Sequence, residues 1–179
     1  LSWVVSKPLT ARALNAEGKD IALINHFGTT DVGVGGTVVM SVGAAEQIVE
    51  NAINVEGVIV ARSAKSHEGK IILDGGKTGQ VRVHNALLDT SAVEPDVNAG
   101  IIHLFGDDVF LTGTTELRAN ADLKGSGQGG AILVGGPKRG DWDSYRNKYK
   151  ENTDQDYTGP SYSANYVHIE KGVKLRARG

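Results

Sequence analysis

The sequence GKIIL spans residues 69–73, and variants of it return as GIIHL at residues 100–104 and GAILV at residues 130–134. Each copy is a short aliphatic run that follows a glycine, which is typical of a β-strand and too short for a helix. A pattern that returns at an interval of roughly 20–50 residues indicates a repeat protein, in which each copy belongs to one supersecondary unit.

Two further strand patterns recur beside this one. The first is an aliphatic residue, any residue and then a small one; it occurs as IVA at 59–61, LDT at 88–90, and LRA at both 117–119 and 175–177. The second occurs as VRV at 81–83, VFL at 109–111 and VHI at 167–169. Three strand patterns in fixed order predict an all-β solenoid, a parallel β-helix of about five coils. Only residues 42–54 have a spacing that predicts a turn or two of helix.

The repeats also predict which side chains fill the interior. We expect three inward columns, each built from equivalent positions of successive coils. One column is aliphatic, one is a tight corner with small side chains, and one lies on the third strand. Their members are Ile59, Leu88, Leu117 and Leu175; Ala61, Thr90, Ala119 and Ala177; and Val83, Leu111 and Ile169.

A long insertion is predicted within the last coil. Leu88 follows Ile59 by 29 residues and Leu117 follows Leu88 by 29, but Leu175 follows Leu117 by 58. Only one strand of each other pattern lies in that last interval, so we interpret it as one coil with a loop at 137–165. We therefore expect residues 1–179 to form a single β-helix segment. The chain stops directly after a repeat motif, which suggests a piece of a longer rod.

Several of these motifs together resemble a known family. They are GKIILDGG at 69–76 with GQVRV at 79–83, LDTS at 88–91, GGAILVGG at 129–136 and VHIEKGVKLRA at 167–177. As a set they resemble the filamentous-haemagglutinin-like exoproteins of bacterial two-partner secretion, which include the high-molecular-weight adhesins. The resemblance covers roughly residues 50–179. It implies a right-handed parallel β-helix on a secreted or cell-surface adhesin of a Gram-negative bacterium, exported by an outer-membrane secretion partner.

The predicted loop 137–165 contains most candidate binding residues. It contains four of the five tyrosines, and its positive and negative charges balance. Aromatic rings offer a large contact area, and the polar side chains between them offer directed hydrogen bonds, a mixture suited to a host glycan or protein. The candidate ligand-binding residues are Trp142, Tyr145, Arg146, Tyr149, Tyr157 and Tyr162. The alternative is a loop that only covers the side of the rod.

Two other functions remain open at this stage. A β-helical lyase or glycosidase needs paired carboxylates on one lateral face. The adjacent pair Asp107–Asp108 falls in a turn, and Asp74, His84 and His103 belong to three different columns, so we expect all of them at the surface. We therefore predict no enzyme and assign no catalytic residue. The second alternative is an exoprotein of the same family that captures haem or a host protein with the same loop.

Composition limits the remaining classes. The 179 residues have a formal net charge of −2, which does not favour a nucleic-acid partner, and no apolar run long enough to predict a transmembrane helix. Cysteine is absent, so the chain has no disulfide and no thiolate ligand. The five histidines lack ligand spacing, and we predict no metal and no other cofactor.

Overall fold

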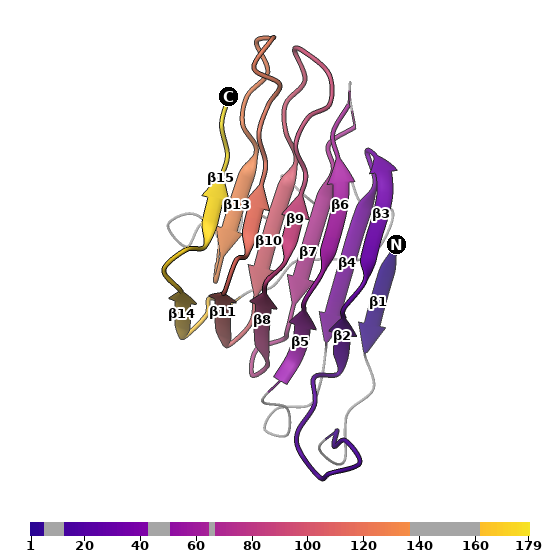
Figure 1. Cartoon of the computed structure of the whole chain (residues 1–179), viewed down its shortest axis with the longest axis vertical. Helices are drawn as coiled ribbons and strands as arrows, with labels where there is room; N and C mark the ends of the chain where they lie inside the picture. Colours follow the sequence, from indigo (N-terminus) through magenta and orange to yellow (C-terminus); the bar gives the residue numbers. More distant parts are fainter. Residues whose placement is uncertain (6–12, 43–50, 65–66, 137–161) are drawn as a thin grey trace.

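A computed structural model describes residues 1–5, 13–42, 51–64, 67–136 and 162–179. Within these ranges the secondary structure is entirely β, organised as three parallel sheets of five strands each. The predicted fold class, a parallel β-helix, is confirmed. Figure 1 shows the chain advancing steadily along the stack, from the indigo N-terminal strands at one end to the yellow C-terminal strands at the other. The described residues include no helix that could cross a membrane.

Successive strands enter the three sheets in rotation. Sheet 1 contains β1 (Ser2–Val5), β4 (Thr37–Val42), β7 (Lys70–Asp74), β10 (Ile101–Phe105) and β13 (Ala131–Val134). Sheet 2 contains β2 (Ile24–His26), β5 (Asn51–Val55), β8 (Gln80–His84), β11 (Asp108–Thr112) and β14 (Tyr166–Ile169). Sheet 3 contains β3 (Thr29–Val34), β6 (Val58–Arg62), β9 (Leu87–Asp89), β12 (Glu116–Arg118) and β15 (Lys174–Arg176).

The register of sheet 3 places the predicted aliphatic column in the interior. Ile59 pairs with Leu88, Leu88 with Leu117, and Leu117 with Leu175. The first three side chains are completely buried, whereas Leu175, on the terminal strand, is 43% exposed. The column therefore forms as predicted, and its last member has a neighbouring strand on one side only.

The same pairing settles how the chain gets from Leu117 to Leu175. Strand β12 pairs directly with β15, β11 with β14 and β10 with β13. The two leucines therefore lie on adjacent coils, as the repeat patterns predicted. Residues 137–161, most of the predicted loop, lie outside the described residues.

The recurring glycines are explained by close packing between coils. A Cβ atom on Gly100 would lie 2.0 Å from the carbonyl oxygen of Gly69, and one on Gly130 would lie 1.8 Å from that of Gly100. These same oxygens accept hydrogen bonds from the next coil, 2.9 Å from the Ile101 nitrogen and 3.1 Å from the Ala131 nitrogen. No side chain fits at this corner, so GKIIL, GIIHL and GAILV all begin with glycine.

The helix predicted for 42–54 is wrong wherever the structure describes that stretch. Strand β4 continues to Val42, and β5 begins at Asn51, while residues 43–50 lie outside the described part. Strand β5 pairs with β2 and β8, and this pairing buries Ile53 and Val55 in the interior. Cross-strand packing therefore outweighs the local helical spacing.

The surface positions expected for Asp74 and His103 are also wrong. His103 is 1% and Asp74 is 9% exposed, although both side chains point to the outer face of sheet 1. The residues that alternate with them along β7 and β10 point into the interior. The reason is that the outward face of sheet 1 is itself covered around β7 and β10, so that Ile72 and Phe105 are buried there as well. His84, on sheet 2, is half-buried.

Candidate ligand-binding groove

The outer face of sheet 2 presents a row of polar and aromatic side chains. In β8, Val81 and Val83 point inward and are completely buried, so Arg82 between them points outward. The register aligns Asn25 with Asn54, Asn54 with Arg82, and Arg82 with Phe110. Each residue comes from a different coil, and neighbours in the row are about 4.8 Å apart.

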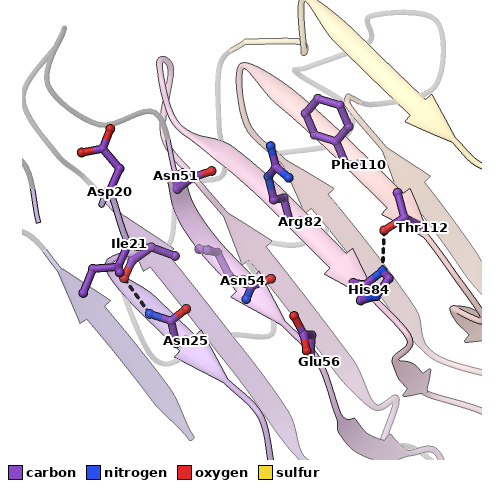
Figure 2. Close-up of a pocket in the computed structure, with 12 residues that line it drawn as sticks. Asp20, Ile21, Asn25, Asn51, Asn54, Glu56, Arg82, His84, Phe110 and Thr112 are labelled. Atoms are coloured by element: carbon purple, nitrogen blue, oxygen red, sulfur yellow. Dashed lines mark hydrogen bonds between the residues drawn. The ribbon is translucent and has the colours of Figure 1, made fainter. Parts of the chain in front are cut away.

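A groove of about 510 Å³ lies along this row. Its lining is rich in carboxamides, from Asn25, Asn51 and Asn54. Charged groups come from Asp20, Glu56 and Arg82, and the far end is bounded by His84, Phe110 and Thr112. Figure 2 shows these side chains along the outer side of neighbouring strands and of the turns beside them.

Several side chains of the groove are held in place by their neighbours. The Asn25 Nδ2 atom donates to the Ala22 carbonyl oxygen at 2.7 Å, and His84 Nδ1 lies 2.9 Å from Thr112 Oγ1 (Figure 2). Arg82 donates through Nε to Gln80 Oε1 at 2.5 Å, and its guanidinium lies 5.1 Å from the centre of the Phe110 ring. Arg82 is therefore fixed by a hydrogen bond and by a cation–π contact.

One polar atom of the groove lacks a partner. Asn51 Oδ1 is buried, and within the described part of the chain it accepts no hydrogen bond. A buried acceptor without a donor is unfavourable, typically by about 1–3 kcal/mol.

A second groove, of about 420 Å³, follows the outer face of sheet 3 and contains two carboxylates, Asp89 and Glu116. Glu116 accepts a hydrogen bond from Arg118 at 2.7 Å and forms an ion pair with Arg176 Nε at 2.8 Å, and Asp89 lies 3.7 Å from Arg62. The hydrogen bond from Arg118 is the main reason that the pKa of Glu116 is lowered. A glycosidase acid needs a raised pKa instead, so Glu116 does not have the electrostatics of a general acid.

Of the six predicted binding residues, only Tyr162 lies within the described residues; Trp142, Tyr145, Arg146, Tyr149 and Tyr157 lie outside them. Tyr162 is half-buried, and its hydroxyl donates to Asp74 on the outer face of β7. Burial, and then the charge of Asp74, raises the pKa of the Tyr162 phenol. Tyr162 thus contacts the side of the rod.

The sequence analysis missed the groove residues Asn25, Asn54, Arg82 and Phe110. Only Asn25 and Asn54 share a residue type, so the row as a whole forms no repeated motif. The available signal was positional: each lies between or beside the inward-facing residues of the strand patterns, and the repeat register alone would have aligned Arg82 with Phe110. The expected turn at Asp107–Asp108 is partly right, since Asp107 precedes β11 and Asp108 begins it.

No protein-family model matches this chain, and neither does any curated protein or solved structure. In the residues described, no group of three or more His, Asp or Glu side chains is arranged to hold a metal ion.

Proposed function

We propose that this chain is a rod segment of a secreted bacterial surface adhesin of the filamentous-haemagglutinin-like type. The β-helix is the scaffold, and the loop 137–165 is the part that contacts a host glycan or protein. The parent protein would reach the surface through an outer-membrane secretion partner, as the motif resemblance implies.

The observation that supports this proposal most directly is the uninterrupted stacking of the three sheets. Every strand from β1 to β15 belongs to one of the three sheets and pairs in parallel with the equivalent strand of a neighbouring coil. Each coil contacts mainly its neighbours, so the structure extends along one axis and its lateral faces run along that axis. Such a scaffold is suited to presenting loops away from a surface.

The loop begins and ends at one point on this scaffold. The Ala164 nitrogen, near the end of the loop, donates to the carbonyl oxygen of Gly135, just before its start, at 2.6 Å. Tyr162 then fastens the end of the loop to Asp74. A binding loop on a rigid support is expected to have its two ends held close together in this way.

The proposal can be tested by adhesion to host cells. Beads coated with the whole chain are added to cultured epithelial cells and compared with beads that carry a variant in which residues 137–161 are replaced by a short Gly/Ser bridge. This variant keeps Tyr162 and its contact with Asp74, and the adjacency of Gly135 and Ala164 allows a short bridge. We expect adhesion by the whole chain and its loss in the variant.

Far-UV circular dichroism supplies the control, because both proteins should retain the same β-sheet signal. Adhesion that survives removal of the loop would exclude the loop as the contact. Absence of adhesion by both proteins would contradict the adhesin function of this segment.

A further inference from the structure

The groove on the outer face of sheet 3 is lined by side chains from four successive coils. Arg62 comes from β6, Asp89 from β9, Arg118 from β12 and Arg176 from β15. Its volume of about 420 Å³ falls within the range of roughly 300–1,000 Å³ that is usual for ligand sites. Neighbouring strands are about 4.8 Å apart, so the groove runs along the rod for roughly 14 Å. It therefore fits an elongated ligand that lies across the strands.

The charges of this groove differ in depth. The carboxylates are the more deeply buried, since the side chain of Asp89 is 6% exposed and that of Glu116 is 16% exposed. The arginine side chains are nearer to solvent, at 50% exposed for Arg62, 39% for Arg118 and 36% for Arg176. A molecule that enters the groove therefore meets guanidinium groups first, and the carboxylates hold these groups in place.

Contacts within the fold use the acceptors of the groove and leave its donors. One oxygen of Glu116 contacts Arg118 Nη2, and the other contacts Arg176 Nε. The side-chain oxygens of Ser91 and Asn120 accept from main-chain nitrogens at 3.2 and 3.1 Å. Each arginine uses one nitrogen in its contact with Glu116, whereas a guanidinium has five N–H donors. The groove thus presents N–H and O–H groups, which suits a ligand with anionic oxygens.

Two residues beside the groove add positive charge. Lys174 lies on the same outer face as Arg176, two residues before it, and its charge contributes to the lowered pKa of Glu116. Arg178 is exposed, and its main-chain nitrogen donates to the Asn120 side chain in the groove. Together, the groove and these two residues contain five cations and two carboxylates, although the whole chain has a formal net charge of −2. This part of sheet 3 therefore attracts anions.

The register of the arginines favours a polysaccharide among the anionic ligands. Arg118 and Arg176 are paired in register, so they are about 4.8 Å apart along the rod. This spacing is close to the length of one sugar unit in an extended chain, so a chain with a carboxylate on each unit meets one coil per unit. A guanidinium binds a carboxylate through two parallel hydrogen bonds, which fixes the orientation of both.

We propose that the groove on sheet 3 binds a uronic-acid polysaccharide that runs along the rod, with carboxylates of successive sugar units paired with Arg118 and Arg176 and with Arg62 farther along the chain. This inference does not rest on the adhesin proposal. The groove is on sheet 3, whereas Tyr162, at the end of the loop, contacts Asp74 on sheet 1.

The test is a calorimetric titration of the whole chain with a galacturonic-acid oligosaccharide, in a buffer free of divalent cations. A neutral dextran oligosaccharide and dextran sulfate are the comparison ligands. We expect saturable binding of the galacturonate and none of the neutral dextran. Arg62→Gln and Arg176→Gln should each weaken this binding by about tenfold. These two side chains are 50% and 36% exposed, so both variants should keep the wild-type β-sheet signal and urea midpoint.

Two further variants separate recognition from general attraction. Lys77→Gln is the matched control, because it removes one exposed positive charge between β7 and β8, outside the groove, and should leave the affinity unchanged. Arg176→Lys keeps the charge but loses the planar pair of donors, so it should weaken the binding several-fold. Full affinity in Arg176→Lys would mean attraction by charge alone and would overturn the carboxylate pairing.

Four other outcomes would overturn the proposal. They are no saturable binding of the galacturonate, binding of dextran sulfate alone, full affinity in both Arg→Gln variants, and an equal loss in Lys77→Gln. The variant in which residues 137–161 are replaced should keep the binding, and loss there would exclude the groove as the site. Cell adhesion is measured separately, so failure of the groove leaves the adhesin proposal to its own test.

Discussion

Replacement of Leu117 tests the inward column most directly. Its side chain is completely buried and lies between Leu88 and Leu175 in the register of sheet 3. Leu117→Ala removes buried methyl groups and leaves a cavity, which should lower the free energy of unfolding by about 2–5 kcal/mol. Leu175→Ala is the matched control in the same column: that side chain is 43% exposed, so its loss should be about half as large.

A charge at the same position should be far more damaging. Leu117→Asp loses the same apolar burial and also places a carboxylate within the apolar core. Holding that carboxyl group neutral at pH 7 would require its pKa to rise by about 3 units, which adds about 4 kcal/mol. The combined loss, roughly 6–9 kcal/mol, is comparable with the whole stability of a typical domain, so the variant should be largely unfolded at pH 7.

Urea denaturation followed by far-UV circular dichroism measures these effects. Leu117→Asn serves as the uncharged control for Leu117→Asp, since it is polar and of similar size but needs no neutralisation. The reasoning would be refuted by a Leu117→Asp variant that is soluble and unfolds cooperatively near the wild-type midpoint. An effect of Leu175→Ala as large as that of Leu117→Ala would also contradict the column described.

Three further predictions concern His103, Tyr162 and Gly100. Burial, and then the charge of Lys70, lowers the pKa of His103 to about 3 from its usual 6.5, so the unfolded chain takes up the proton first as the pH falls. The free energy of unfolding should therefore be highest above about pH 6.5 and be lower by about 2 kcal/mol at pH 5. His103→Phe should reduce the dependence of this free energy on pH, and an unchanged dependence would contradict the argument. Tyr162→Phe removes the donor to Asp74 and should cost about 1–3 kcal/mol in urea unfolding, whereas an unchanged midpoint would mean that water replaces the phenol. Gly100→Ala should lower the free energy of unfolding by about 3 kcal/mol or more, because the new Cβ atom meets main-chain atoms. Gly28→Ala is the control, because there is open space around Gly28, and it should change the urea midpoint little. Equal effects of the two substitutions would contradict the packing argument.

Most of the fold could be predicted because the interior repeats its chemistry. Ile59, Leu88 and Leu117 occupy equivalent positions and had to be apolar, so their period was visible in the sequence. The glycine corner was visible for the same reason. The segment from Asn51 was misjudged because its helical spacing is local, whereas the strand it forms depends on β2 and β8, which are distant in sequence.

The candidate site was harder to predict because outward positions do not repeat. Asn54, Arg82 and Phe110 become neighbours only through the register, and nothing in their types indicates it. The burial of His103 depended on whether the outer face of sheet 1 is covered, and strand periodicity reports only the inner face. A repeat pattern of this kind thus identifies the β-helical scaffold more readily than the binding site on its outer face.

The glycine corner has a consequence for how such a rod changes length. Gly69, Gly100 and Gly130 each leave no room for a side chain against neighbouring main chain, and each continues into a strand of sheet 1. A duplication or deletion of the DNA between any two of these codons would add or remove a whole coil and rejoin equivalent backbone. The rod can therefore lengthen or shorten over generations in steps of one coil, while a single substitution at the same glycine would be selected against.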